Sequence, residues 1–299
     1  MNPQPVSSRP PLSVVFATRC RWSEIAAFLD VIEDQVRAVG GELLVVDGRS
    51  AALPNETEDA ASWIHAPGSD VFELRALGAA RARGEVVAYT EDHCEVAPDW
   101  CERILTAHRD HPDASVVAGA VLNGSEGRMI DRANFVLAHA SNLPPLRDVP
   151  REWASSGANV SFKREVLPAD TPGRGWLDFV VPAEAIAGGR FVVDDRIRVR
   201  HVQSYGVVGT VANWYHSGRC LAVLTAGLTP SVRRASLALT GLALPYSLLR
   251  RAFRVARSKP SGRQAYRLIA PMVVLAFGAA TGFVMGVLAG PGNSLQRLR

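Results

Sequence analysis

The chain has 299 residues, of which 47% are hydrophobic and 21% are charged, and its net charge is +4. This composition excludes a disordered, collagen-like or disulfide-stapled protein, and the length allows one large domain or two ordinary ones. The net charge averages two unlike parts. Residues 1–195 contain all 29 Asp and Glu, whereas residues 196–299 contain 15 Lys and Arg and no acidic residue. So long a basic segment indicates a negatively charged partner, such as lipid head groups, a polyphosphate or nucleic acid.

The amino terminus and the cysteines indicate an intracellular chain. Residues 1–11 are rich in Pro and Ser and predict a flexible N-terminus. The apolar run at residues 12–17 is shorter than a signal-peptide core, so we expect no export signal. The four cysteines have no spacing typical of a zinc or redox motif, which favours reduced thiols in a cytosolic compartment.

Residues 12–120 alternate between strand-like and helix-like segments. Short apolar runs predict strands at 12–17, 42–46, 62–65, 86–89 and 115–120. Helical spacing of apolar residues predicts helices at 22–39, 71–83 and 100–111. This alternation predicts an α/β fold with a mostly parallel, Rossmann-like sheet flanked by helices. Ligands bind such sheets beyond the carboxyl ends of the strands, where Asp47 and a loop at 90–95 are expected.

Residues 121–200 are less regular and are rich in Gly, Asn and Pro. Strand-like runs occur at 158–162, 190–193 and 196–202, and Asp194 and Asp195 between the last two predict a turn. We expect this region to form an acceptor-side lobe of the same domain.

Two apolar stretches follow residue 206. Residues 268–290 contain no charge and are long enough to span a bilayer, whereas the apolar run at 235–249 is marginal. The alternative for residues 268–290 is a buried helix of a soluble domain. Gly278, Gly282 and Gly286 have the four-residue spacing of a helix-packing face. Seven basic residues at 250–267 favour a cytoplasmic position, so we expect residues 232–257 to lie in the membrane interface and 268–290 to form a transmembrane helix or hairpin.

Glu91, Asp92 and His93 follow the strand predicted at 86–89. Carboxylate oxygens suit Mg²⁺, whereas Mn²⁺ accepts carboxylate and imidazole together. An ion held by Glu91 and His93 could bridge to a diphosphate. The alternative for this tripeptide is a solvated acidic loop.

The segments 74–78, 82–94 and 98–100 resemble the stretch that leads into the metal-binding Asp-x-Asp motif of family 2 glycosyltransferases, which have the GT-A fold. Further segments similar to the family's motifs follow its order along the chain, at 16–19, 45–50, 156–162, 176–178 and 199–201. The sequence departs from the family pattern in three places: Glu91 replaces the first Asp of the motif, His93 replaces the last, and Leu177 replaces a Glu.

The resemblance implies a role for each matching residue. The implied nucleotide-sugar-binding residues are Ala17, Thr18, Arg19, Asp47, Arg75, Glu91, Asp92, Gly157 and Asn159. The implied ligands of a divalent metal, Mn²⁺ or Mg²⁺, are Glu91, His93 and His201, and an imidazole ligand favours Mn²⁺. Asp178 stands at the position of the catalytic base, with Glu184 as the alternative.

These observations predict a membrane-attached, inverting glycosyltransferase of the bacterial inner membrane, with its catalytic domain in the cytoplasm. A nucleotide-diphosphate sugar, preferably a UDP-sugar, would donate to a lipid-linked or polysaccharide acceptor in cell-envelope polysaccharide biosynthesis. The basic segment would contact anionic membrane lipids, and its long apolar runs argue against nucleic acid. The alternatives are a catalytically degenerate membrane subunit that keeps the fold and a nucleotidyltransferase on a similar fold. The predicted domains are residues 12–205 for transfer, 206–230 as a connecting segment and 231–299 as membrane-associated helices.

Overall fold

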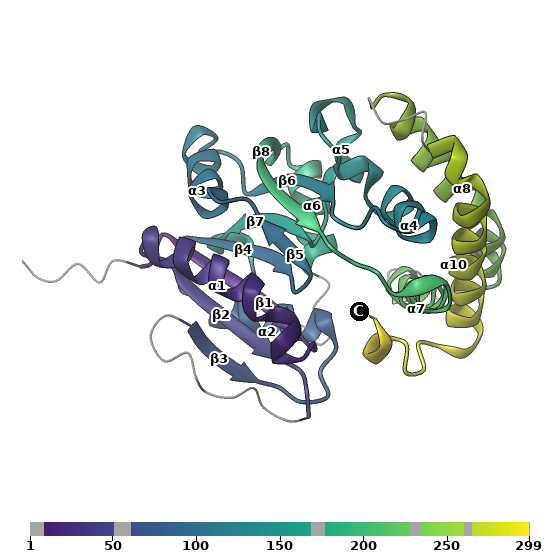
Figure 1. Ribbon diagram of the computed structural model, residues 1–299, viewed down its shortest axis with the longest axis horizontal. Coiled ribbons are helices and arrows are strands. Elements are labelled where there is room, and N and C mark those ends of the chain that lie inside the picture. The colour runs from purple at the N-terminus through teal and green to yellow at the C-terminus, as the bar shows by residue number, and fades with distance from the viewer. Residues whose placement is uncertain (1–8, 51–60, 169–176, 228–233, 260–264, 299) are drawn as a thin grey trace, which may run out of the picture. The chain divides into compact units, whose positions relative to one another are not determined.

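The computed structural model describes residues 9–50, 61–168, 177–227, 234–259 and 265–298 (Figure 1). Most of the predicted flexible N-terminus, and Trp176 of the segment 176–178, lie outside the described residues. The chain divides into two compact units. The first comprises Met1–Ala120 and Ser155–Val199, and the second comprises Val121–Ala154 and Arg200–Arg299. The division into units does not test the predicted domains at 12–205, 206–230 and 231–299, which stay a prediction.

An eight-stranded sheet carries the first unit, in the order β3-β2-β1-β4-β7-β6-β8-β5. Its strands are β1 (Leu12–Thr18), β2 (Glu42–Asp47), β3 (Ala61–His65), β4 (Val86–Glu91), β5 (Cys94–Val96), β6 (Val116–Asn123), β7 (Asn159–Lys163) and β8 (Phe191–His201). β1 runs parallel to β2 and β4, and β2 runs parallel to β3. β7 runs antiparallel to β4 and β6, so the sheet is mixed.

The burial of the strands explains their composition. Every residue of β1 and β2 is buried, which is why both strands read as almost continuous apolar runs. The helices of this unit are α1 (Trp22–Ala38), α2 (Val71–Arg81), α3 (Trp100–Asp110) and α6 (Leu177–Ala187). Asp70 caps α2 by accepting hydrogen bonds from the backbone N–H groups of Phe72 and Glu73. A Cβ at Gly78 would lie 2.4 Å from Val15 Cγ1, so glycine allows α2 to pack closely on β1.

The second unit is helical, and the glycines predicted to mark a packing face do so. Its helices are α4 (Met129–His139), α5 (Arg151–Ala154), α7 (Gly206–Gly227), α8 (Arg234–Arg257) and α10 (Ile269–Ala289). A Cβ at Gly282 would lie 1.9 Å from the carbonyl oxygen of Tyr215, and one at Gly286 would lie 2.6 Å from that of Arg219. The two backbones therefore meet where α10 carries no side chain, and the prediction for Gly282 and Gly286 is confirmed.

One helix of the described chain, Tyr266–Ala289, is long and apolar enough to cross a membrane, with a mean hydropathy of 2.2. Within the second unit, 44% of the most apolar 18-residue segment of this helix is buried. A core cluster joins α10 to α4 and α8, and includes Met272, Leu275 and Ala276 of α10 beside Leu137 and Ala252. Length and composition thus agree with a membrane anchor, while one face of the helix packs on protein.

Three local predictions are wrong. The loop expected at 90–95 is a two-residue turn, because β4 continues to Glu91 and β5 begins at Cys94. The two runs at 190–202 form the single strand β8. Asp194 and Asp195 lie within β8 and form no turn, and the Asp194 carboxylate accepts hydrogen bonds from the backbone and side chain of Arg196. The helices α4 and α6 were not expected in this stretch.

Candidate active site

Three parallel strands end at one edge of the sheet and bring the predicted residues together. In the sheet register, Thr18 of β1 lies beside Asp47 of β2, and Ala17 lies beside Glu91 of β4. Because β4 continues to Glu91, the turn that follows places Asp92 and His93 at the same edge. This is the carboxyl edge at which parallel sheets bind their ligands.

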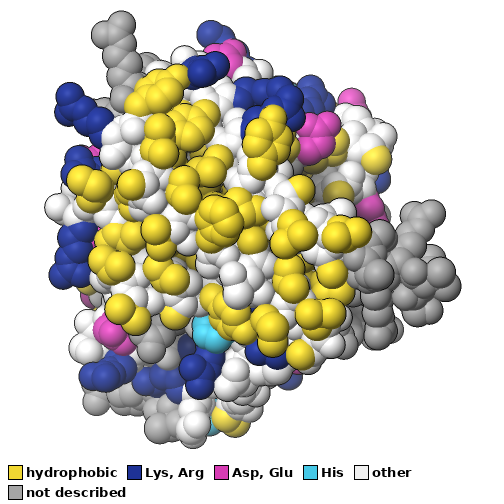
Figure 2. Space-filling model, turned by 90° about the vertical axis from the view of Figure 1, so that its right-hand side faces the viewer, with side chains coloured by type: hydrophobic (Ala, Val, Ile, Leu, Met, Phe, Trp, Pro, Cys, Tyr) yellow, Lys and Arg dark blue, Asp and Glu magenta, His cyan; other side chains and the backbone are white. Residues whose placement is uncertain are grey.

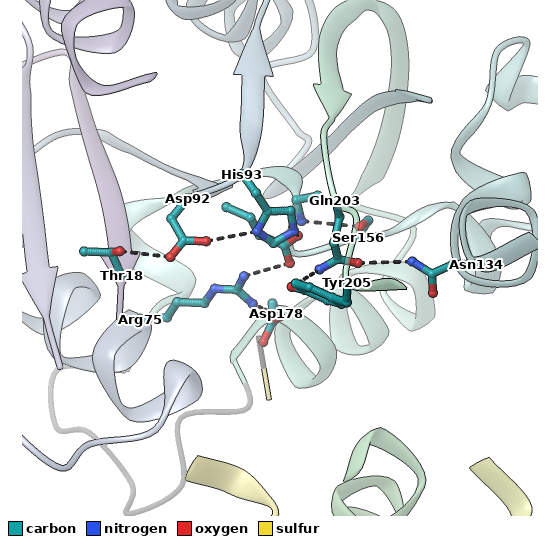
Figure 3. A network of polar contacts seen from close by, with 11 residues as sticks. Thr18, Arg75, Asp92, His93, Asn134, Ser156, Asp178, Gln203 and Tyr205 are labelled. Atoms are coloured by element: carbon teal, nitrogen blue, oxygen red, sulfur yellow. Dashed lines mark hydrogen bonds and ion pairs between the residues drawn. The ribbon is translucent and has the colours of Figure 1, made fainter. Parts of the chain in front are cut away.

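A chain of polar contacts begins at this edge (Figure 3). Thr18 Oγ1 donates a hydrogen bond to Asp92 Oδ2 at 2.9 Å. The other carboxylate oxygen of Asp92 lies 2.9 Å from His93 Nδ1. His93 Nε2 in turn lies 3.2 Å from Glu91 Oε2. Both ring nitrogens of His93 thus face carboxylates.

Arg75 continues the chain of contacts into the interior. Its Nη2 donates to Glu91 Oε1 at 2.9 Å, and its Nη1 donates to Asp178 Oδ2 at 2.8 Å. Arg75 comes from α2 and Asp178 from the first turn of α6, so two helices meet the strand end through one guanidinium. We call the connected set Thr18, Asp92, His93, Glu91, Arg75 and Asp178 the site network.

The charges of the turn stabilise one another. Burial by itself lowers the pKa of His93, but hydrogen bonds and charge from Asp92 and Glu91 outweigh it and raise the pKa to about 10. Burial by itself raises the pKa of Asp92, but hydrogen bonds from His93 and Thr18 outweigh it, and the net pKa of Asp92 is lowered. Each of these two charges therefore stabilises the other.

The donor atoms at the turn fit a divalent ion. A carboxylate and an imidazole converge at Glu91 Oε2 and His93 Nε2, a donor pair that Mn²⁺ accepts. Asp92 holds the opposite ring nitrogen, as the carboxylate partners of metal-binding histidines do. His201, the third predicted ligand, is the last residue of β8 and belongs to the second unit. It is buried there, with its ring centroid 4.6 Å from that of His139.

Asp178 has the properties of a proton acceptor. It is buried, with 5% of its surface exposed, and its Oδ1 has no hydrogen-bond partner among the described residues. Burial raises the pKa of Asp178, and the charge of Glu91 adds to this effect while Arg75 opposes it. A carboxylate with one oxygen held and the other without a hydrogen-bond partner is suited to accept a proton from a substrate hydroxyl. Glu184, the alternative base, is exposed further along α6.

Gly157 packs directly against the ion pair of Arg75 and Asp178. A Cβ there would lie 2.5 Å from Asp178 Oδ2 and 2.6 Å from Arg75 Nη1. Only glycine leaves room for the two charged groups to meet at this position. Gly157 therefore lies against the site network, and its contact with the nucleotide-sugar stays a prediction.

Two predicted nucleotide-sugar-binding residues make hydrogen bonds outside the site network. The Asp47 carboxylate is buried and accepts hydrogen bonds from the backbone and guanidinium of Arg49. The Asn159 amide donates to the carbonyl oxygens of Ala120 and Ile197 and accepts from Trp100 Nε1. Asn159 therefore ties its strand to the neighbouring backbone and does not join the site network.

A second group of polar contacts, missed by the sequence analysis, lies within the second unit (Figure 3). Asn134 Nδ2 donates to Gln203 Oε1 at 3.2 Å and Asn134 Oδ1 accepts from Trp214 Nε1 at 2.7 Å. Gln203 also donates to the Tyr205 hydroxyl. These contacts fasten α4 and α7 to the segment after β8. The sequence carried no signal for them because α4 itself was not predicted.

Comparisons with known proteins agree with this architecture. The model of the family described as Glycosyl transferase family 2 matches residues 13–167. The glucosyl-dolichyl phosphate glucuronosyltransferase of Haloferax volcanii is 28% identical over 96 residues, and the match spans 31% of this chain and 31% of that relative. Among solved structures, the mannosyltransferase PcManGT from Pyrobaculum calidifontis, in complex with GDP-Man and Mn²⁺, superposes with a TM-score of 0.55. That superposition covers 93% of this chain and 88% of the other at 18% identity, which shows a shared fold.

Proposed function

Because the chain belongs to glycosyl transferase family 2, we propose that it moves a sugar from a nucleoside-diphosphate sugar to an acceptor hydroxyl, with inversion at the anomeric carbon. The proposal depends above all on the buried Asp178, whose Oδ1 has no hydrogen-bond partner among the described residues, a property that supports a role as general base. In this role Asp178 takes the proton of the acceptor hydroxyl as that oxygen attacks the sugar. One base that activates the acceptor hydroxyl corresponds to a single displacement, and hence to inversion.

Arg75 supports Asp178 and links it to the turn. Its guanidinium holds Asp178 Oδ2 and Glu91 Oε1 at the same time, which orients the base relative to the strand end. Its positive charge also opposes the effect of burial, which on balance raises the pKa of Asp178. We therefore assign Arg75 to positioning in addition to the predicted contact with the donor.

Glu91 and His93 would hold a divalent metal, with His201 as the third ligand that the family resemblance predicts. A carboxylate and imidazoles form a suitable donor set for Mn²⁺. When bound, such an ion neutralises charge on the departing diphosphate. Asp92 fixes the ring of His93 from its other side. The Mn²⁺ named with the Pyrobaculum calidifontis mannosyltransferase supports this choice of metal.

Residues at the neighbouring strand ends are proposed to receive the nucleotide. Ala17 and Thr18 end β1, Arg19 follows it, and Asp47 ends the adjacent strand. A UDP-sugar is the preferred donor from the family resemblance, and GDP-sugars belong in the test because the mannosyltransferase is named with GDP-Man.

The acceptor is proposed to be lipid-linked or a polysaccharide at the cytoplasmic face of the inner membrane. The apolar helix Tyr266–Ala289 and the acid-free segment 196–299 support membrane attachment. The name of the Haloferax volcanii relative, which includes a dolichyl phosphate, supports a lipid phosphate acceptor. In this proposal residues 12–205 carry the reaction and residues 231–299 attach the enzyme to the membrane.

The non-catalytic alternative depends on Leu177, which is buried beside Asp178 and supplies no carboxylate. The intact connection from Asp178 through Arg75 to Glu91 supports catalysis instead. Nucleotide release separates the two: the full chain is purified in detergent and given UDP- and GDP-sugars with Mn²⁺ or Mg²⁺.

We expect Asp178→Asn to release nucleotide at least about 100-fold more slowly than the wild type. The exposed Asp113→Asn is the matched control and should behave as the wild type does. Equal rates for Asp178→Asn and the wild type would remove Asp178 from the mechanism. No release by the wild type with any donor would favour the non-catalytic subunit.

A further inference from the structure

The carboxyl-terminal part of α8 presents two guanidinium groups to one indole ring. Arg251 and Arg254 lie one helical turn apart, with their Cζ atoms 5.4 Å and 5.9 Å from the centroid of the Trp153 ring. Arg251 Nη2 also donates to Ser141 Oγ at 2.7 Å and to the carbonyl oxygen of Trp153 at 3.3 Å. Cation–π contacts and hydrogen bonds to neutral groups therefore hold the cations in place.

Among the described residues, no carboxylate pairs with either of these two cations. Among the ion pairs of the described residues, none includes Arg251 or Arg254. Asp148, on a segment near Trp153, pairs with Arg147 at 3.8 Å. Burial lowers the pKa of Arg251, as expected for a partly desolvated cation without an anionic partner. Two guanidinium groups on one ring repel each other, so an anion bound to both would stabilise them.

The same helix presents apolar side chains on its exposed face. Leu239, Leu242 and Tyr246 are 67%, 70% and 71% exposed. Their spacing places them on one face of α8, and Arg250 and Arg254 continue that face toward the carboxyl end. Figure 2 shows hydrophobic side chains gathered over this side of the molecule, with Lys and Arg toward its edges. The exposed surface of α8 thus changes from apolar to cationic along the helix.

We propose that Arg251, Arg254 and Trp153 bind the phosphate of an anionic phospholipid while the apolar face of α8 enters the acyl region. This inference rests on the membrane attachment in the proposed function and names the lipid group that is recognised. Guanidinium groups donate paired hydrogen bonds that fit phosphate oxygens. The adjoining apolar face favours a lipid phosphate over a soluble one.

Binding of the full chain to vesicles tests the site. Flotation is compared between phosphatidylcholine vesicles and vesicles that also contain phosphatidylglycerol, at high salt, where diffuse attraction is screened. We expect the wild type to prefer the phosphatidylglycerol vesicles about tenfold, and the double variant Arg251→Gln, Arg254→Gln to lose this preference. Binding to phosphatidylcholine alone should remain within about twofold, because the apolar face of α8 is unchanged.

Two further double variants test whether the preference for phosphatidylglycerol depends on the specific site or only on positive charge. Arg37→Gln with Arg109→Gln removes the same charge from exposed positions on α1 and α3 and should keep the high-salt preference. Arg251→Lys with Arg254→Lys keeps the charge but not the planar stacked groups, and should lose most of it. Equal losses in the two Gln double variants, or full preference in the Lys variant, would overturn the site. A thermal melt of each variant checks that it is folded.

Separate measurements test whether the bound phosphate belongs to a lipid and whether the chain attaches to membranes at all. Inorganic phosphate, added at constant ionic strength, should not release the wild type from the vesicles. Release would show that the site takes free phosphate and would overturn the lipid assignment. If the wild type binds neither vesicle, the membrane attachment itself fails, whereas nucleotide release still reports separately on the transfer reaction.

Discussion

Replacing Gly157 with Ala would insert a methyl group against the ion pair of Arg75 and Asp178. The new Cβ would lie 2.5 Å from Asp178 Oδ2 and 2.6 Å from Arg75 Nη1, whereas ordinary contacts begin at 3.4 Å. One of the charged groups must therefore move by nearly 1 Å, and Arg75 is also held by Glu91. A displacement of about 1 Å in a catalytic group costs about 100-fold in rate. Overpacking should also lower the free energy of unfolding by about 1–3 kcal/mol.

The assay is nucleotide release at saturating donor and metal, with a thermal melt to confirm that the variant is folded. Gly127→Ala is the matched control, because a Cβ at Gly127 would meet no atom within 4 Å. We expect the control to keep both the rate and the melting temperature of the wild type. A folded Gly157→Ala variant whose rate stays within about twofold of the wild type would refute the reasoning. The geometry of Arg75 and Asp178 would then not limit the reaction.

Three further predictions concern the metal, the pH dependence and the helical unit. His93→Ala should weaken Mn²⁺ binding at least about tenfold, as measured by calorimetry, whereas the exposed control His65→Ala should not. Equal Mn²⁺ affinities of the two variants would show that His93 is not a metal ligand. Burial, with the charge of Lys163, lowers the pKa of His108 from 6.5 to about 4. As the pH falls between these values the unfolded chain binds the proton first, so stability present above pH 6.5 is lost, by up to about 3 kcal/mol. His108→Gln should flatten that loss in urea unfolding, and an unchanged pH dependence would contradict the assignment. Gly282→Ala should lower the melting temperature, since its Cβ would lie 1.9 Å from a backbone oxygen of α7, whereas Gly278→Ala, with 3.4 Å to its nearest neighbour, should not. Equal effects at the two positions would show that the close approach of α7 and α10 does not depend on Gly282.

Helices and strands with a strong local pattern of apolar residues could be predicted from the sequence. Elements that depend on contacts with distant parts of the chain could not. β1 and β2 are short apolar runs because both of their faces are buried, and α1 carries its apolar residues at helical spacing. The strand β8 was divided in the prediction because two adjacent aspartates resemble a turn. Pairing in the sheet and the hydrogen bonds from Arg196 keep Asp194 extended. The order of the family-like segments along the chain selected Glu91, His93 and Asp178 as candidate site residues. It did not say which of their side chains are in contact.

The sequence by itself determined the local features of this protein. These include the apolar strands, the turn residues after β4, the glycine spacing of α10 and the absence of acidic residues after Asp195. Only the tertiary structure decided which charges meet. Arg75 reaches Glu91 across 16 positions and Asp178 across 103, and Asn159 is used by the backbone of neighbouring strands. The physical reason is that local pattern reflects which face of an element is buried, whereas an ion pair depends on the path of the whole chain between its partners.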